Sequence, residues 1–567
     1  MQTVPNLKAE KESFRIDVKW IIILLAILLL VLFEVLPMLY LIIKSFFVEN
    51  TLKLGNYSSV YSKAVNWNAF INTFKISFYV MILSIIIAFP LAWLVGRTNL
   101  PGKNFFRTLF VTTYMIPPYV GAIAWAQLLN PKVGYLNIAL MKIFKLSKTP
   151  FDIYGVGGLV WVFTLFYCPY AFITISRALE KMDPTLEEAA RVSGSSPLRT
   201  VRDVTLPLMY PSILAGGLLV FISVASAFGI PSIIGMPAKI EVLTTRIVTY
   251  VYMGNSKGIS EATALAVSLM ITSNIILFLT TMVLGKKEYV TISGKSTRPN
   301  LVDLGKWKWP ITVLVIIYSI ISVFLPMGSI FITSLIKSLS KPITLSNLTV
   351  NNWIEALKNP AYLEAFKNSL ILAVIAATVG TIISMFLSYL LVKTEAKGRK
   401  IPDFLVTIGS STPSVVIALA LIMTFSGRFG INMYSTMTIL IVAYIIKYLL
   451  MSMRTISASL TQVHSSLEEA ALNSGASWIR SFKDILLPLI SPSIVAGWFL
   501  IFMPCFYELS MSILLYGAKT KNIGVLLYEL QTYADPQSAS VLSVLVLIVV
   551  LGGNAIIRKL SKGDIGI

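Results

Sequence analysis

Few side chains in this 567-residue chain are suited to acid–base or metal chemistry. The sole histidine, His464, lies in a polar segment, and both cysteines, Cys168 and Cys505, lie in apolar runs. These residues cannot supply a Ser/His/Asp set or a His- or Cys-based metal site. The sequence also lacks a Gly-x-x-x-x-Gly-Lys-Ser/Thr loop, so we do not expect it to hydrolyse ATP. It therefore predicts a non-enzyme with no metal or cofactor of its own.

Two carboxylates, Glu34 and Glu508, are surrounded by apolar residues. An ionisable group inside a membrane is costly and usually faces a cavity or a partner. Each could line a polar cavity or serve as a structural hydrogen-bonding group, and the sequence leaves both readings open. Lys447 is expected near the end of an apolar segment, with its amine reaching the membrane surface. Asn72 and Asn368 are expected to form interhelical hydrogen bonds.

The composition indicates an all-α membrane protein. The chain is 56% hydrophobic and 13% charged, whereas a soluble protein carries about 25% charged residues. Apolar runs of about 20 residues alternate with short polar stretches, which is typical of membrane-spanning helices. We read the first run as a span and not as a cleaved signal. The twelve predicted spans are 20–43, 70–96, 106–128, 155–176, 207–232, 261–284, 310–335, 367–392, 402–426, 435–453, 488–514 and 538–556.

The net charge of +21 fits basic cytoplasmic loops better than nucleic-acid binding. Lys and Arg are more abundant in the loops that would be inside if the N-terminus were cytoplasmic. An even number of spans then places both termini in the cytoplasm. The basic linker 285–309 would also be cytoplasmic, between a first half, 1–284, and a second half, 310–567.

The two halves repeat each other. Leu36-Pro37 matches Leu325-Pro326 at an offset of 289 residues, and Pro117 matches Pro413 at an offset of 296. Each half has six predicted spans and starts on the same side of the membrane. The repeats are therefore parallel and related by an axis along the membrane normal.

The best-matched part of the repeat lies between the fourth and fifth spans of each half. Its two copies correspond at an offset of 281 with no gap. The first copy contains Glu187, Glu188, Ala189, Ala190 and Gly194, and the second contains Glu468, Glu469, Ala470, Ala471 and Gly475.

Local chemistry predicts a helix–turn–helix for this segment. Acidic residues favour a helix N-terminus, paired alanines favour the helix, and glycine suits a left-handed helix end. Ser196 and Ser477 suit the N-cap of a second short helix. Pro207 and Pro488 are expected to end that helix and begin the next span. We name the segments 183–206 and 464–487 the first and second coupling loops.

This Glu-Ala-Ala loop, with a glycine seven residues after the first glutamate, resembles the signature of type I ABC importer permeases. The resemblance implies a multi-pass protein of the bacterial inner membrane. It further implies that the two loops dock onto a dimer of ATP-binding-cassette ATPase subunits. An extracytoplasmic substrate-binding protein would deliver the cargo.

Fused two-half permeases of this family resemble ferric-iron, thiamine and aminoethylphosphonate importers. The stretches 227–235 and 243–247 look like the ferric-iron and phosphonate group. Tyr507, Glu508 and Ser510 resemble that group's acidic motif, although Tyr507 stands where a basic residue is expected. Ferric iron favours oxygen ligands, so these three residues, and also Glu34, are candidates for the substrate pathway.

Three alternatives remain open. The same architecture could import 2-aminoethylphosphonate or thiamine instead of iron. A secondary transporter or channel could act without an ATPase, although such a protein would not need two docking loops. A membrane enzyme or scaffold is disfavoured because the catalytic residue sets are missing.

Overall fold

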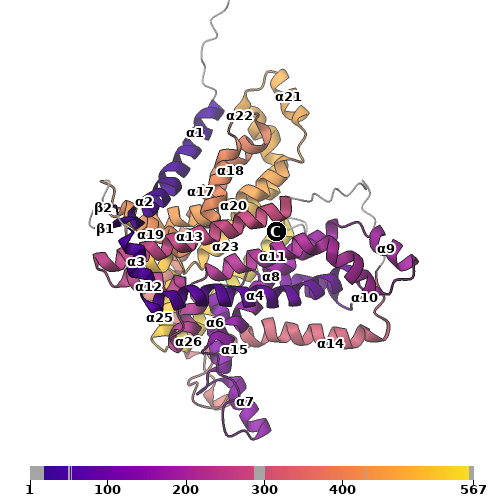
Figure 1. Ribbon diagram of the computed structural model, residues 1–567, viewed down its shortest axis with the longest axis vertical. Helices are drawn as coiled ribbons and strands as arrows, with labels where there is room; N and C mark the ends of the chain where they lie inside the picture. Colours follow the sequence, from indigo (N-terminus) through magenta and orange to yellow (C-terminus); the bar gives the residue numbers. More distant parts are fainter. Residues whose placement is uncertain (1–17, 49–50, 53, 286–300, 428–429, 561–567) are drawn as a thin grey trace, which may run out of the picture.

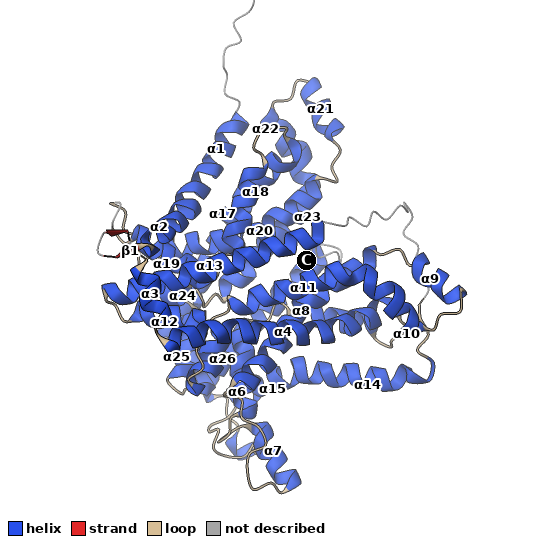
Figure 2. Cartoon of the chain, in the orientation of Figure 1, coloured by secondary structure: helices blue, strands red, loops and turns tan. Residues whose placement is uncertain are grey.

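The computed structural model describes residues 18–48, 51–52, 54–285, 301–427 and 430–560, and helices dominate it (Figure 2). A short hairpin pairs β1 (Phe47–Val48) with β2 (Thr51–Leu52). The helical segments of the first half are α1 (Val18–Leu30), η1 (Val31–Val35), α2 (Leu36–Ser45), α3 (Gly55–Tyr61), α4 (Ala64–Arg97), α5 (Lys103–Thr113), α6 (Pro118–Leu129), α7 (Tyr135–Phe144), α8 (Val156–Lys181), α9 (Thr185–Val192), α10 (Pro197–Thr200), η2 (Val201–Thr205), α11 (Leu206–Ala225), η3 (Pro231–Gly235), η4 (Met236–Ala238), α12 (Leu243–Tyr252) and α13 (Ser256–Gly285).

The second half repeats this order except that, among the described residues, it has no counterpart of α7. Its helical segments are η5 (Gly305–Trp307), α14 (Lys308–Ser319), η6 (Ile320–Phe324), α15 (Leu325–Ser334), η7 (Leu345–Asn347), α16 (Asn351–Lys358), α17 (Pro360–Lys393), α18 (Lys400–Ser411), α19 (Ser414–Phe425), α20 (Met437–Leu460), α21 (Ser465–Asn473), α22 (Trp478–Ser481), η8 (Phe482–Leu486), α23 (Leu487–Phe506), α24 (Ser512–Leu515), α25 (Ile523–Thr532) and α26 (Pro536–Leu560). In Figure 1, α9 and α10 lie at one corner of the molecule and α21 and α22 at another.

Ten helical segments among the described residues are long and apolar enough to cross a membrane, and up to twelve if each of two bent pairs counts as one span. The bent pairs are α5 with α6, at 101°, and α18 with α19, at 106°. They replace the straight spans expected over 106–128 and 402–426. The bends fall before Pro118 and at Pro413, because the residue preceding a proline avoids helical backbone angles. Pro117 and Thr412 accordingly have extended ψ values of 122° and 134°.

Four Leu-Pro pairs do not break their helices. Each follows a five-residue π-helical segment: η1, η2, η6 and η8. In each, the N–H of the leucine donates to the carbonyl five residues earlier, as Leu206 does to Val201. The wider turn makes room for the proline ring, which would clash with a carbonyl in a regular helix. The expectation that Pro207 and Pro488 end a short helix is therefore wrong, since Pro197–Ala225 and Trp478–Phe506 are each one continuous helical segment.

The first span of each half packs against the other half. The segment containing α1 and α2 contacts α17 and α19, and Phe33 packs on Phe425 with ring centroids 5.6 Å apart. Reciprocally, α15 contacts α6, where Thr333 donates a 2.9 Å hydrogen bond to Gln127. This exchange joins the two halves into one structure.

Hydrogen bonds at equivalent positions reproduce the sequence repeat. Asn72 donates to the carbonyl of Glu241, and Asn368 donates to the carbonyl of Lys521. Both amides thus join a long span to the loop before a short helix, α12 or α25. The two asparagines link separate elements, but their partners are loop carbonyls, whereas the sequence predicts hydrogen bonds to a second helix.

Candidate functional site

The two coupling loops have the backbone that their sequence predicts. Helices α9 and α21 are each followed by a glycine in the left-handed region, with φ of +88° at Gly194 and +86° at Gly475. Ser196 and Ser477 then accept a backbone N–H at the start of α10 and α22. A left-handed glycine followed by a serine N-cap gives a sharp reversal between two short helices.

The first glutamate of each loop is buried and anchors the loop to its own half. In the first loop, a carboxylate oxygen of Glu187 lies 3.2 Å from Nε of Arg97, at the end of α4. Its other oxygen accepts a 2.6 Å hydrogen bond from Thr205 in η2. In the second loop, Glu468 accepts a 2.5 Å hydrogen bond from the hydroxyl of Tyr389 in α17.

The remaining motif residues lie towards the outside of the loops. Glu469, Ala189 and Ala470 are exposed, whereas Glu188, Ala190 and Ala471 are partly buried. Exposed apolar side chains accompany them, including Val192 at 90% exposure and Leu198 at 80%. Such apolar tips on short helices are suited to insertion into a cleft of another protein.

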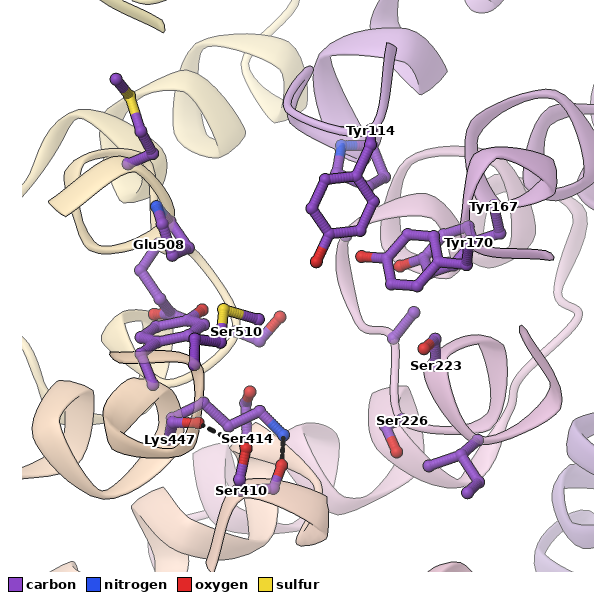
Figure 3. A pocket seen from close by; sticks show the side chains of 18 of the residues that line it. Tyr114, Tyr167, Tyr170, Ser223, Ser226, Ser410, Ser414, Lys447, Glu508 and Ser510 are labelled. Atoms are coloured by element: carbon purple, nitrogen blue, oxygen red, sulfur yellow. Dashed lines mark hydrogen bonds between the residues drawn. The ribbon is translucent and has the colours of Figure 1, made fainter. Parts of the chain in front are cut away.

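A chamber of about 480 Å³ lies between the halves. Figure 3 shows its two polar walls facing each other. One wall carries hydroxyl side chains of the first half and the other carries residues of the second half. The polar residues labelled there are Tyr114, Tyr167, Tyr170, Ser223 and Ser226 on the first wall, and Ser410, Ser414, Lys447, Glu508 and Ser510 on the second.

The three predicted pathway residues of the second half, Tyr507, Glu508 and Ser510, all line this chamber. The Glu508 carboxylate, however, is 4% exposed and accepts hydrogen bonds from the backbone N–H groups of Met511 and Ser512. It also accepts a 2.8 Å bond from the Ser512 hydroxyl. This carboxylate therefore caps the start of the short helix α24.

Glu34 lies elsewhere. It is 3% exposed in the π-helical segment η1, and its carboxylate packs against Gly409 of α18. A Cβ atom at Gly409 would lie only 2.5 Å from a Glu34 oxygen. Glu34 is not among the residues that line the chamber, so the structure does not bring it together with Glu508.

Lys447 was missed as a site residue. The sequence predicts a position near the end of a span, but α20 extends to Leu460 and Lys447 lies at its middle. Its ammonium donates 2.8 Å hydrogen bonds to the carbonyls of Ser410 and Thr412 at the end of α18. Carbonyls at a helix C-terminus lack intrahelical donors and favour a cation. The internal repeat offered a signal, because the 281-residue offset aligns α20 with the long helix α8.

Comparisons with known proteins agree with this architecture. The sequence pattern of the family described as "Binding-protein-dependent transport system inner membrane component" matches residues 88–288 and 380–562. The ferric transport system permease protein FbpB of Actinobacillus pleuropneumoniae is 26% identical over 507 residues, covering 88% of this chain and 72% of that protein. The putative ferric transport system permease protein FbpB 1 of Haemophilus influenzae is also 26% identical, covering 88% and 78%.

Two further similarities cover less of the chain. A putative 2-aminoethylphosphonate transport system permease protein, PhnU, of Salmonella paratyphi A is 26% identical over 168 residues, covering 30% of this chain and 58% of that protein. A solved chain of a bacterial ABC transporter involved in alginate import is 20% identical, covering 44% of this chain and 94% of its own length, with a TM-score of 0.37.

Proposed function

This chain belongs to the family of binding-protein-dependent transport system inner membrane components, and on that premise we propose that it imports ferric iron. It is a multi-pass inner-membrane permease of an ABC importer, made of two fused halves. The observation that supports iron is the match over 88% of the chain to permeases named for ferric transport. The 2-aminoethylphosphonate relative matches only 30% of the chain.

Uptake by cells with and without this chain tests the cargo. Radiolabelled ferric iron, 2-aminoethylphosphonate and thiamine are supplied separately, and the gene is restored on a plasmid as the control. We expect deletion to remove uptake of iron alone. If iron uptake is unchanged while uptake of either organic compound is lost, the iron assignment is wrong.

The permease itself would not hydrolyse ATP. A dimer of ATPase subunits would bind the two coupling loops, and an extracytoplasmic binding protein would deliver the cargo. The paired loops support the first partner, because each presents exposed apolar side chains beside a buried anchoring glutamate. The family's description as binding-protein-dependent supports the second. Co-purification of the permease with the ATPase, in the presence and absence of both loop tips, tests the docking.

Both coupling loops and the linker 285–309 would face the cytoplasm. The described part of the linker supports this, because Val302 donates to the carbonyl of Arg97, beside the first coupling loop. Residues 286–300 and the two chain ends, 1–17 and 561–567, lie outside the described residues. The division into halves at 1–284 and 310–567 likewise remains our proposal.

Cysteine labelling tests this orientation. Both native cysteines are buried, so a single introduced cysteine reports its own position. A membrane-impermeant reagent should label Lys148→Cys on intact cells and Ser195→Cys only after permeabilisation. Labelling of Ser195→Cys on intact cells would reverse the proposed topology.

A further inference from the structure

The first wall of the chamber presents hydroxyl groups to its interior. The rings of Tyr114 and Tyr170 lie with centroids 4.6 Å apart, and both direct their hydroxyls into the chamber (Figure 3). Tyr167 stacks on Tyr170 at 5.3 Å. The Ser226 hydroxyl is buried and has no hydrogen-bond partner among the described residues. A buried polar group without a partner is costly, so this wall is suited to a ligand rich in oxygen.

The second wall presents a cation. An ammonium group has three N–H donors, and that of Lys447 uses two of them on the carbonyls of Ser410 and Thr412. The third N–H is left for the chamber, which Lys447 lines. The same two carbonyl bonds hold the charge in position at the bend between α18 and α19.

The Glu508 carboxylate attracts this cation across the chamber but forms no direct ion pair with it among the described residues. Both of its oxygens are turned to the backbone of Met511 and Ser512, and the side chain is almost fully buried. A carboxylate occupied by several N–H and O–H donors is a poor ligand for a passing metal ion, which would have to displace them. The accessible charge on the chamber wall is therefore that of Lys447.

We propose that this chamber binds its cargo as a small anionic, oxygen-rich species, held by the Lys447 ammonium and the facing tyrosine and serine hydroxyls. This inference rests on the proposed function and refines it. Iron would enter as a ferric ion still bound to anionic oxygen ligands, and not as a bare cation held by Glu508. The volume of about 480 Å³ agrees, because it accommodates a small complex and is far larger than a single ion.

Direct binding to the permease–ATPase complex in lipid nanodiscs tests the proposal without the binding protein. The probe is radiolabelled ferric citrate. We expect Lys447→Met to weaken its binding about ten-fold or more, since a hydrogen bond to a charged group is lost. Lys447→Arg should bind within about three-fold of the wild type, because it retains the cation.

One control and two further variants of the chamber wall accompany these measurements. Lys75→Met removes an exposed lysine from the span α4 and should bind like the wild type. Tyr170→Phe and Ser226→Ala each delete one hydroxyl from the facing wall, and each should weaken binding by about two- to five-fold, which corresponds to a modest hydrogen bond. Because Tyr170 and Ser226 lie on the opposite wall, these two variants still test the chamber if Lys447→Met disturbs the bend between α18 and α19.

The possible results distinguish a failure of the chamber proposal from a failure of the iron assignment. Ferric citrate binding that survives Lys447→Met and is abolished by Glu508→Gln would overturn the proposal. So would a wild-type complex that binds neither ferric citrate nor 2-aminoethylphosphonate. If the wild type binds radiolabelled 2-aminoethylphosphonate but not ferric citrate, and Lys447→Met removes that binding, the chamber proposal stands while the iron assignment fails.

Discussion

Glu187 and Glu468 occupy equivalent positions in the two coupling loops, but different chemistry holds their carboxylates. Glu187 pairs with the buried guanidinium of Arg97 and with the hydroxyl of Thr205. Glu468 pairs with the hydroxyl of Tyr389, which also accepts a 2.8 Å hydrogen bond from Trp478.

Aromatic packing completes the second anchor. Tyr389, Trp478 and Phe482 form a cluster with ring centroids 5.4–5.9 Å apart. The corresponding residues of the first half are Trp93, Pro197 and Val201. The two loops therefore keep the same backbone while one is held by charge and the other by aromatic contact. Both halves retain the geometry of the loop and not one particular set of partners.

Removing that shared geometry should have the largest effect. Gly194 and Gly475 both have positive φ, which costs a β-branched residue about 1–2 kcal/mol or more. The double variant Gly194→Val, Gly475→Val should lose at least about ten-fold of its uptake while it remains in the membrane. Uptake assays measure the transport rate, and immunoblots of membrane fractions measure the amount of the variant in the membrane.

Gly96→Ala is the matched control, because this helical glycine has open space around it. Wild-type transport by the double variant, together with normal ATPase binding, would show that the left-handed turn is not needed for coupling.

The charged anchor should be more sensitive than the aromatic one. Arg97→Met leaves Glu187 buried without its cation, which costs about 3–5 kcal/mol. Tyr389→Phe removes a neutral donor from Glu468 and the acceptor of the Trp478 indole N–H, and should cost about 1–3 kcal/mol. Thermal unfolding of the purified complexes measures the loss of stability in each variant.

Adding Glu187→Gln should recover part of the stability lost in Arg97→Met, since it removes the unpaired charge. It does not restore the Arg97 hydrogen bonds to the carbonyls of Leu179 and Met182. Equal losses for Arg97→Met and Tyr389→Phe, with no rescue, would mean that the two anchors do not differ as described.

Thr205 supplies a contact that the second loop lacks, because Leu486 stands at the equivalent position. Thr205→Val keeps the shape of the side chain and deletes its hydrogen bond to the Glu187 carboxylate. We expect a loss of about 1.5–3 kcal/mol, measured as a shift in the unfolding midpoint. Thr205→Ser should stay close to the wild type. A Thr205→Val protein as stable as the wild type would assign the anchoring to Arg97 alone.

The smallest effects are expected at the starts of α9 and α21. Asp183 accepts the Thr185 N–H at 3.0 Å, and His464 accepts the Ser466 N–H at 3.2 Å. Asp183→Ala and His464→Ala should each speed hydrogen exchange in the first turn of the adjacent helix and change uptake less than about two-fold. Faster exchange throughout α9 or α21 would show that these caps hold the entire loop.

The Asp183 cap also has a predictable pH range. The backbone N–H of Thr185 lowers the pKa of the Asp183 carboxyl, since the bond stabilises its charged form. The contribution of this cap to the stability of α9 is therefore fully present above the usual pKa of an aspartate. It is lost as the pH falls through the lowered pKa of Asp183.

The fold can be predicted from the sequence more completely than the chamber can. Apolar run length and the repeat offsets predict the long helices, because both follow from burial in lipid. A hydropathy profile carries no information on the direction of a helix axis. It therefore cannot show that the chain turns by about 100° at Pro118 and Pro413. The chamber depends on which side chains face each other across the two halves. The sequence therefore singles out Glu508 and allows a structural hydrogen-bonding role for it, but it does not identify α24 as the helix that the carboxylate caps, and it predicts the wrong depth for Lys447.

The uninterrupted helices that carry the coupling loops have a mechanical consequence. Pro197–Ala225 spans 29 residues, or about 43 Å at 1.5 Å per residue. Its far end leads directly into Ser226 and Ala227, which line the chamber. Because the π-helical turn keeps this rod unbroken, a tilt of about 10° imposed at the loop would move the chamber end by roughly 7 Å if the loop were the pivot. That displacement exceeds the width of a water molecule, so a small rotation at the ATPase side would be enough to open or close a passage for a small solute.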